Sequence, residues 1–305
     1  MNMKILITGA TGFIGQALVK ALLDQNDTVI VASRSSRKSD PEQGRVRHIV
    51  WNPEDEKTVL KEIDGVDAVI NLTGEPIAQR WTEKQKQKIL KSRVQATRMV
   101  HQSIKVAMVK PKVLVNASAI GYYGPRTNEA LAEEAGAGTG FLAEVCKVWE
   151  AHAIRVEDLN VRVVRLRTGV VLDREGGALK LMLPPFKMGL GGWLGSGNQW
   201  FSWIHREDLV RLILFCLDQE PVKGAVNAVS PLPVTNKAFS LVLAQVLKRP
   251  CLFPVPAFAL KLMMGEMSEM LLTGQRVVPK KLQQFGFLYQ YPDIRRALEQ
   301  IFKNK

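Results

Sequence analysis

The chain has few residues that could form disulfides or bind metals. Its 305 residues include three cysteines, Cys146, Cys216 and Cys251, which lie far apart and form no Cys-x-x-Cys pair. The sequence therefore indicates neither a disulfide framework nor a cysteine-based metal or redox site. The four histidines show no metal-ligand spacing, so we predict no metal site. A reducing, cytoplasmic setting is the expected location.

The sequence also lacks a long apolar run. Its longest apolar stretches have the length of a strand and are interrupted by charged residues, so we predict no membrane span and no membrane contact. A β-rich apolar run already begins near Lys4, so we expect no removable signal peptide.

Acidic residues are outnumbered, and the formal net charge is +13. Such an excess can favour nucleic acid, an anionic membrane face or an anionic small molecule. The basic residues are spread along the chain, with the densest groups at 34–38, 84–91 and 280–281, and no aromatic-interleaved basic motif occurs. We therefore expect solvated basic faces and a phosphate-rich cofactor, and no nucleic-acid binding.

Glycines are concentrated where the first predicted strand gives way to a helix. The apolar run Ile5–Ile7 ends at Thr8-Gly-Ala-Thr-Gly-Phe-Ile-Gly15, and apolar residues then recur four apart. A strand, a glycine turn and a helix together form the setting in which such glycines bind a nucleotide. Glycines let the backbone approach a pyrophosphate, and the helix start directs N–H groups and its positive dipole end at the anion.

No carboxylate follows the second predicted strand, Thr28–Ala32. In a dinucleotide fold the residue at this point meets the adenosine ribose, and an acidic side chain there repels a 2′-phosphate. Here the chain supplies Ser33, Arg34, Ser35, Arg37 and Lys38. Because a guanidinium can stack on adenine and pair with a phosphate, we predict NADP(H) rather than NAD(H).

Further parallel strands are expected at 67–72, 112–117 and 161–167, with a long amphipathic helix at 81–107 between the first two. The predicted fold class is α/β, a Rossmann-type doubly wound parallel sheet with a smaller C-terminal lobe. We assign residues 1–223 to the NADP-binding domain, with substrate loops at about 175–200, and 224–305 to a small substrate-side domain that opens with a strand at 225–229. A Met- and Leu-rich stretch at 254–272 is typical of adaptable core or of a subunit interface.

Five segments together resemble the extended, epimerase-like branch of the short-chain dehydrogenase/reductase superfamily, in its "epimerase family" group of atypical reductases with a small extra C-terminal domain. They are Thr8-Gly-Ala-Thr-Gly-Phe-Ile-Gly15, Asn71-Leu-Thr-Gly-Glu-Pro-Ile77, Ala117-Ser-Ala-Ile-Gly-Tyr-Tyr-Gly124, Arg167-Thr-Gly-Val-Val-Leu172 and Trp203-Ile-His-Arg-Glu-Asp208.

The resemblance implies an NADP(H)-dependent oxidoreductase or epimerase-like enzyme for a small polar substrate such as a nucleotide sugar, in a monomer or homodimer. The residues implied or predicted to hold the cofactor are Gly9, Thr11, Gly12, Phe13, Ile14, Gly15, Ser33, Arg34, Leu72, Thr73, Gly74 and Thr168. An alternative is a non-catalytic NADP(H)-binding regulator acting through a protein partner, because some family members are named in connection with cell division.

The chain departs from this family at the residues that carry its chemistry. Active members have a serine after the fifth strand and a Tyr-x-x-x-Lys pair on the next helix, where the tyrosine exchanges a proton with substrate. Ser118 or Ala119 falls at the serine position. Leu142 and Cys146 stand where the tyrosine and lysine belong, and Lys147 lies about 100° round the helix.

Four other residues are candidates for substrate contact or catalysis. Either Tyr122 or Tyr123 could take over proton transfer, or both are packing anchors. Glu75 could bind a substrate hydroxyl or act as a base, or it could cap a helix or pair with Arg80. His205 precedes a predicted helix and is either a catalytic partner or structural.

Overall fold

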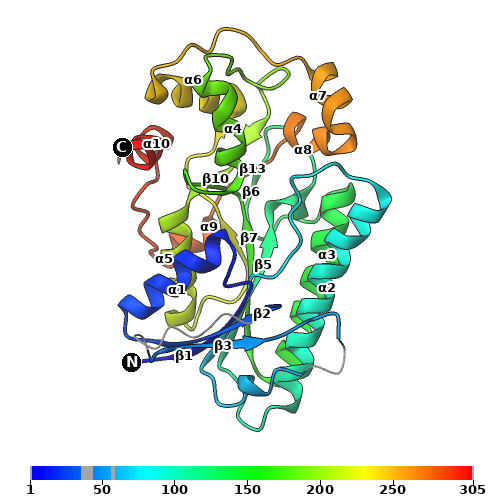
Figure 1. The fold of residues 1–305 in the computed structure, drawn as a ribbon, viewed down its shortest axis with the longest axis vertical. Coiled ribbons are helices and arrows are strands. Elements are labelled where there is room, and N and C mark those ends of the chain that lie inside the picture. Colours follow the sequence, from blue (N-terminus) through cyan, green and yellow to red (C-terminus); the bar gives the residue numbers. More distant parts are fainter. Residues whose placement is uncertain (1, 36–43, 56–58, 304–305) are drawn as a thin grey trace.

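Parallel strands form the centre of the protein in a computed structural model (Figure 1). The structure describes residues 2–35, 44–55 and 59–303. The strands of the main sheet are β1 (Lys4–Thr8), β2 (Thr28–Ser33), β3 (Val46–Val50), β4 (Ala68–Asn71), β5 (Val113–Ala119), β7 (Arg162–Thr168) and β11 (Gly224–Ala228). Their order is β11-β7-β5-β4-β1-β2-β3, so the order reverses between β1 and β4. This confirms the predicted doubly wound α/β fold.

Helices cover both faces of this sheet (Figure 1). Helices α1 (Phe13–Asp24) and α5 (Arg206–Asp218) cover one face, and α2 (Glu83–Val106) and α3 (Phe141–Ile154) cover the other. Side chains alternate between the two faces, so Ile5 and Ile7 pack beneath α1 and α5 while Leu6 packs beneath α2 and α3. Burial on both sides explains why these strands are nearly continuous in apolar residues.

The strand predicted at 225–229 belongs to the main sheet. It is β11, which pairs in parallel with β7 from Gly224↔Val164 to Ala228↔Thr168. The expectation that this strand opens a separate C-terminal domain is therefore wrong. Farther along the chain, Leu282 and Phe287 also join the core beneath α1 and α5.

A second hydrophobic core is shared by two separate segments of the chain. It unites Leu172, Leu183 and Trp203 with Phe239 and Leu298, which come from the two sides of the predicted boundary at 224. The elements around it are β8 (Val170–Leu172), α4 (Gly177–Lys187), β9 (Trp200–Phe201), β10 (Trp203–His205), β12 (Val234–Thr235), α6 (Asn236–Leu247) and α10 (Ile294–Lys303). This upper lobe therefore contains most of the predicted substrate loop at 175–200, part of which is helix α4.

The methionine-rich stretch forms α7 (Ala257–Met264), the 3-10 turn η4 (Gly265–Met267) and α8 (Ser268–Leu272). Met264, Met267 and Met270 pack against Trp81 and the first turns of α2 and α3. The Lys86 ammonium and the Glu266 carboxylate, 3.0 Å apart, join the same surfaces. The stretch therefore supplies core contacts on one side, while its Leu262 and Met263 are exposed.

Short elements complete the fold. They are η1 (Lys61–Ile63), η2 (Ile120–Tyr123), β6 (Ala130–Leu131), η3 (Glu157–Leu159), β13 (Arg276–Val277) and α9 (Lys280–Gln284). Strands β6 and β13 pair in parallel. In the described ranges, no helix is both long enough and apolar enough to cross a membrane.

His205 stands at the junction of β10 and α5 and is 1% exposed. Its Nδ1 accepts a hydrogen bond from the Glu207 N–H at 3.2 Å, so it caps α5. Nε2 therefore carries the proton and donates to Gln300 Oε1 at 2.9 Å. Burial lowers the pKa of His205 below its ordinary value. The imidazole is thus neutral and fully engaged in linking α5 to α10.

This burial predicts a loss of stability in mild acid. The unfolded chain takes up a proton on this histidine below pH ~6.5, whereas the folded chain resists protonation, so the contribution is present above that pH and is lost as the pH falls below it. We expect His205→Asn, which keeps a capping oxygen, to unfold with a shallower pH dependence than the wild type between pH 7.5 and 5.5. The measurement is urea unfolding across that range, and one proton contributes at most about 1.4 kcal/mol per pH unit.

His101 provides the matched control, because it is half-buried on α2 and burial also lowers its pKa. His101→Asn should flatten the profile less than His205→Asn does. Parallel profiles for the wild type and His205→Asn would contradict a neutral, buried His205.

Candidate functional site

Three glycines shape the turn between β1 and α1. Gly9 has φ +74°, and a Cβ there would lie 2.8 Å from the Leu72 carbonyl carbon. A Cβ on Gly15 would lie 2.6 Å from the Gly9 carbonyl oxygen. The Gly12 N–H donates to that same oxygen at 3.1 Å. The turn is therefore tight and free of side chains, as a dinucleotide-binding turn requires.

The first turn of α1 is left without a cap. Gly12 is its N-cap residue, no side chain hydrogen-bonds there, and the first turn contains no acidic residue. Thr11 precedes the helix, and its carbonyl accepts a hydrogen bond from the Gln16 side chain at 2.8 Å. The N–H groups of Phe13, Ile14 and Gly15 have no partner earlier in the helix, so this end can bind an anion.

The Phe13 ring has a separate packing role. A Cβ on Gly176 would lie 2.3 Å from the ring, and the Arg206 guanidinium lies 5.1 Å from its centroid on another side. Arg206 is itself fixed by an ion pair with Asp173, whose carboxylate lies 3.1 Å from its Nε. The start of the predicted substrate loop is thus held against α1, and the backbone of Phe13 is the part suited to a phosphate.

The end of β2 carries Ser33 and Arg34. The Ser33 hydroxyl donates to the Ser35 carbonyl at 2.8 Å, which shapes the turn, and Arg34 is exposed. Arg37 and Lys38 lie outside the described residues. Residues 33–35 present a hydroxyl and a guanidinium and no carboxylate, as the preference for a 2′-phosphate requires.

The loop after β4 forms the other wall of the crevice. The Leu72 backbone is the group that Gly9 approaches, and Gly74 lies against Arg93 of α2. The Thr73 N–H is held by Asn71 Oδ1 at 3.3 Å. Because the strand order reverses between β1 and β4, this is the crevice where ligands of open α/β sheets bind.

Beneath the crevice, an amide cluster ties three strand ends together. The Thr8 hydroxyl donates to Asn71 Oδ1 at 2.7 Å. The Asn71 amide donates to Asn116 Oδ1 at 2.7 Å and to Thr97 Oγ1 at 3.1 Å. The Trp149 indole N–H also reaches Thr97, at 3.0 Å. These buried bonds fix the positions of Leu72 and Thr73 relative to the glycine turn.

Glu75 is half-buried in the same loop. Its N–H donates to Ser92 Oγ at 3.0 Å, and its carbonyl accepts from Arg93 at 3.0 Å. The carboxylate takes a weak contact from the Gln79 amide at 3.4 Å. The backbone is thus well fixed, and the carboxylate keeps most of its acceptor capacity for a ligand.

Thr168 ends β7 and sits beside Ala119 of β5 in the sheet register. Its hydroxyl donates to the Leu166 carbonyl at 3.3 Å. Thr168 therefore lies at the carboxyl edge of the sheet, on the β5 side of the crevice, and its contact with a cofactor stays a prediction.

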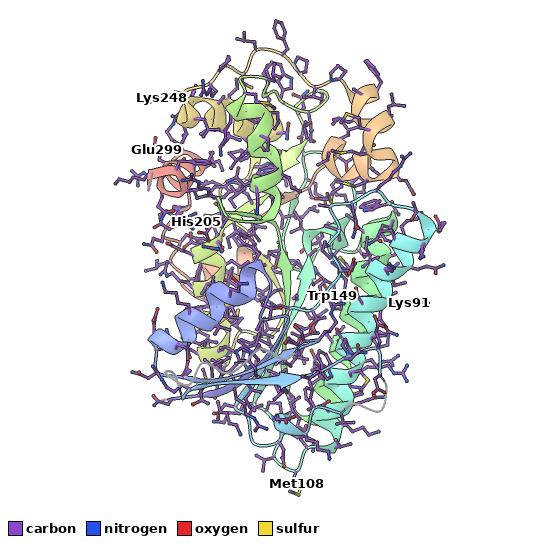
Figure 2. All side chains as sticks on the ribbon, in the orientation of Figure 1. Lys91, Met108, Trp149, His205, Lys248 and Glu299 are labelled. Atoms are coloured by element: carbon purple, nitrogen blue, oxygen red, sulfur yellow. The ribbon has the colours of Figure 1, made fainter. Side chains whose placement is uncertain are left out.

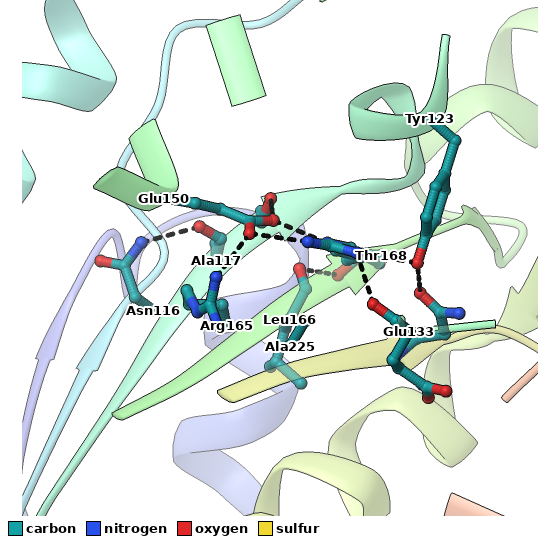
Figure 3. A network of polar contacts seen from close by, with 12 residues as sticks. Asn116, Ala117, Tyr123, Glu133, Glu150, Arg165, Leu166, Thr168 and Ala225 are labelled. Carbon is teal, nitrogen blue, oxygen red and sulfur yellow. Dashed lines mark hydrogen bonds and ion pairs between the residues drawn. The ribbon is translucent and has the colours of Figure 1, made fainter. Parts of the chain in front are cut away.

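Ser118, predicted to face substrate, is buried in a network around Glu150 (Figure 3). Its hydroxyl donates to Glu150 Oε1 at 2.7 Å. Arg167 donates to both oxygens of that carboxylate, at 2.8 and 3.0 Å, and Arg165 donates to Oε2 at 2.9 Å. Burial disfavours the charge of Arg167, but its bonds to Glu150 and Tyr123 prevail and raise the pKa of its guanidinium.

Tyr123 belongs to the same network and is 0% exposed. Its hydroxyl donates to Asn227 Oδ1 at 2.7 Å and accepts from Arg167 at 2.9 Å. Burial, opposed by the charge of Arg167, raises the pKa of this phenol. The ring end in Figure 3 points into the protein toward Glu133 and β11. Tyr123 and Ser118 thus have buried partners that occupy their hydroxyls.

Tyr122 differs from its neighbour. It is half-buried, and its ring lies over the Arg167 guanidinium, 3.5 Å from the guanidinium carbon to the centroid. The Tyr123 ring packs edge-on against it, with centroids 5.5 Å apart. Its ring is therefore fixed, and within the described chain no hydrogen bond occupies its hydroxyl.

The positions of the family's tyrosine and lysine are filled by packing side chains. A Cβ on Gly121 would lie 3.1 Å from Leu142 Cβ and 3.7 Å from Cys146 Sγ, so α3 packs closely on η2 here. Burial raises the pKa of the Cys146 thiol to about 12. Lys147 is exposed and pairs with Glu144 at 2.8 Å. The standard pair is thus replaced by an apolar contact, and Lys147 does not substitute for the lysine.

Sequence reasoning missed the partners of Glu150, namely Arg165 and Arg167. Three arginines, Arg162, Arg165 and Arg167, in a strand whose other residues are Val, Leu and Thr were the available signal, because buried cations require buried partners. Asn227, Asn116 and Glu133 carried no comparable signal. In the described chain, no group of three or more His, Cys, Asp or Glu residues could hold a metal ion.

A pocket of about 700 Å³ lies away from the crevice, between Gly195–Ser196 and the α7–α8 region. Lys261, Glu266 and Glu269 bring mixed charges to its wall. It contains none of the predicted site residues.

Comparisons with known protein families match two separate regions of the chain. The NAD dependent epimerase/dehydratase family matches residues 5–228, which end with β11. A domain of unknown function, DUF1731, matches residues 255–301. The epimerase family protein YfhF of Bacillus subtilis is 40% identical over 99% of this chain and 99% of its own length.

Two solved structures are similar to this chain over almost its whole length. The human epimerase family protein SDR39U1, crystallised with NADPH, is 34% identical with a TM-score of 0.89, over 99% of this chain and 100% of that one. A nucleoside-diphosphate sugar epimerase from Corynebacterium glutamicum is 29% identical with a TM-score of 0.80, over 99% of this chain and 58% of that one. This protein therefore belongs to the NAD-dependent epimerase/dehydratase family, in its SDR39U1-like group with a C-terminal DUF1731 domain.

Proposed function

We propose that this protein is an NADP(H)-dependent oxidoreductase or epimerase-like enzyme. The observation that carries the proposal is the uncapped start of α1 beside the Gly9–Leu72 contact, at the point where the strand order reverses. The human relative that was crystallised with NADPH supports the choice of coenzyme. A small polar substrate, with a nucleotide sugar as the leading class, is supported by the family and by the Corynebacterium relative, which is named as a nucleoside-diphosphate sugar epimerase.

Different residues are suited to bind different parts of NADP(H). The N–H groups of Phe13, Ile14 and Gly15 are suited to the pyrophosphate, Arg34 to the 2′-phosphate, and Leu72 to Gly74 to the ribose side of the crevice. Thr168 completes the far wall. When bound, NADP(H) supplies hydride transfer at its nicotinamide ring.

Tyr122 is the residue of this edge best suited to hold or move a proton. It keeps a free hydroxyl on a ring that Arg167 and Tyr123 fix in place. Ser118 and Tyr123 are buried and already bonded. Glu75, on the loop across the crevice, retains acceptor capacity for a substrate hydroxyl.

A second candidate function is a non-catalytic NADP(H)-binding regulator that acts through a protein partner. The packing of Leu142 and Cys146 against Gly121 favours it, because the standard proton-transfer pair is replaced by apolar contact. Screening NADPH oxidation with carbonyl compounds and nucleotide sugars separates the two candidates. Turnover supports the enzyme, and tight coenzyme binding without turnover supports the regulator.

Coenzyme choice depends on Arg34 in this proposal. We expect the wild type to bind NADPH at least tenfold more tightly than NADH in a fluorescence titration. Arg34→Asp should weaken NADPH binding at least tenfold and leave NADH binding equal or improved, since the carboxylate repels the 2′-phosphate and accepts a 2′-hydroxyl. Lys88→Asp, the same charge change on an exposed residue of α2, should alter neither titration.

The Gly12→Ala variant tests the pyrophosphate-binding turn independently of the preference between NADPH and NADH. Gly12 has φ −78°, which alanine adopts readily, and a Cβ there meets the Gly9 carbonyl oxygen at 3.2 Å. The variant should fold and lose at least tenfold in affinity for both coenzymes, because the methyl group projects where a pyrophosphate needs close backbone approach. Wild type that binds neither coenzyme, or Gly12→Ala that binds both normally, would overturn the proposed site.

The two tyrosines should respond differently to loss of the hydroxyl. Tyr122→Phe should leave stability nearly unchanged and lower kcat by 10²-fold or more on any substrate found in the screen. Tyr123→Phe leaves Asn227 Oδ1 and Arg167 without their buried partner, so it should destabilise by about 1–3 kcal/mol in urea unfolding. Equal kcat for the wild type and Tyr122→Phe would remove Tyr122 from the chemistry.

A further inference from the structure

Large apolar side chains stand exposed at one end of the molecule. We call this set the apical surface; it consists of Met188, Leu190, Leu252, Phe253, Phe258, Leu262 and Met263. Phe253 and Phe258 are 76% and 74% exposed, and Leu262 is 80% exposed. Figure 1 shows the segments that carry them, namely the end of α4 with the loop after it, the α6–α7 connection and α7, together at the top of the molecule.

Contacts between backbones bring these segments together. The Val255 N–H donates to the Trp193 carbonyl at 2.7 Å, and the Gly195 N–H donates to the Val255 carbonyl at 2.9 Å. A Cβ on Gly192 would lie 2.1 Å from the Phe253 carbonyl oxygen, so these two segments of the chain are in close contact there. The loop after α4 therefore runs beside the α6–α7 connection.

The exposed side chains are carried by a stiff support. Pro250, Pro254 and Pro256 restrict the backbone on both sides of Leu252 and Phe253, because each fixes its own φ and restricts the residue before it. On α7, Phe258 and Leu262 are four residues apart and share one face. Little backbone conformational entropy is then lost when a partner covers these side chains.

The two segments that supply the apical surface carry charge of one sign, although Glu266 and Glu269 share a pocket wall with Lys261 beside it. The sequence contains no Asp or Glu from 176 to 206 or from 221 to 265, the two segments that supply the surface. Exposed cations do occur there: Lys187 at the end of α4, Arg249 before the proline loop, and Lys261 on α7. Within the described chain, no ion pair neutralises these three. The nearest acidic residues along the chain, Glu266 and Glu269, follow α7, and Glu266 is paired with Lys86.

We propose that the apical surface docks this protein on an anionic lipid membrane. Protruding Phe, Leu and Met side chains flanked by Lys and Arg are the composition of a protein face that lies at the bilayer interface. A second copy of this chain would place like charges opposite each other. The pocket beside α7 carries Glu266 and Glu269 as well as Lys261, which disfavours an acidic peptide there. The flat, negative lipid surface therefore fits both the shape and the charge.

This docking needs no membrane-spanning segment and is independent of the coenzyme crevice. The sequence-based expectation of no membrane contact rested on the lack of an apolar run of spanning length, and such a run is not required for interfacial binding. The apical surface projects from the upper lobe, whereas the glycine turn precedes α1 at the sheet (Figure 1). Coenzyme and membrane can thus be bound together.

The test is sedimentation of the full-length protein with vesicles. We expect binding to vesicles of phosphatidylcholine with about one-third phosphatidylglycerol, weaker binding to phosphatidylcholine alone, and release by high salt. Phe253→Ser with Phe258→Ser should reduce binding at least tenfold. Lys187→Gln, Arg249→Gln and Lys261→Gln together should also reduce it at least tenfold, since each cation near an anionic surface contributes about fivefold.

Met108→Ser with Val109→Ser is the matched control, because Met108 lies at the opposite end of the molecule (Figure 2), and it and the next residue, Val109, are 88% and 62% exposed. This variant should bind vesicles like the wild type. Wild type that fails to bind anionic vesicles overturns the proposal, as does vesicle binding that survives the Phe253→Ser and Phe258→Ser pair. A dimer in sedimentation velocity that the same pair dissociates would assign the surface to a second copy and would also overturn it.

Discussion

The buried carboxylate of Glu150 joins one helix of the protein to two strands of the main sheet. It lies on α3 and accepts hydrogen bonds from Ser118 of β5 and from Arg165 and Arg167 of β7. Through Arg167 and Tyr123 the network continues to Asn227 of β11. Breaking such a buried pair by removing one partner is costly, because the remaining charge stays buried. The need to pair the buried charge of Glu150 thus fixes the relative positions of α3, the strands β5, β7 and β11, and the turn η2.

That constraint explains how the carboxyl edge of the sheet differs from that of an ordinary reductase of this superfamily. The hydroxyls of Ser118 and Tyr123 hydrogen-bond to buried groups. Leu142 and Cys146 fill the space between α3 and η2. The coenzyme half of the edge is built from backbone and glycine and is left intact. The proposed coenzyme binding and the proposed catalysis therefore depend on different residues, so that an enzyme and a regulator that bind coenzyme are both compatible with this fold.

The parts that could be predicted from sequence depend on local rules. The glycine turn, the strands with continuous apolar runs and the long helix that was expected at 81–107 and found at 83–106 follow from periodicity and short-range geometry. The family comparison confirms the group that five motifs indicated. The predictions that were wrong concerned residues whose partners lie far along the chain. Strand β11 was assigned to the wrong lobe because its pairing with β7 leaves no trace in its own residues, and Tyr123 was a substrate candidate because Asn227 lies 104 positions away.

The position of β11 has a consequence for how the chain can be divided. The matched epimerase region ends at residue 228, with the last residue of β11, yet the edge of this strand is held by later residues. Lys281 donates to the carbonyls of Lys223 and Ala225, and the Asn227 amide donates to the Val278 carbonyl. A fragment ending at the family boundary would expose unpaired edge groups and part of the core beneath α1, which invites aggregation. The C-terminal domain therefore covers the outer edge of the main sheet, and the sheet depends on it to keep that edge closed.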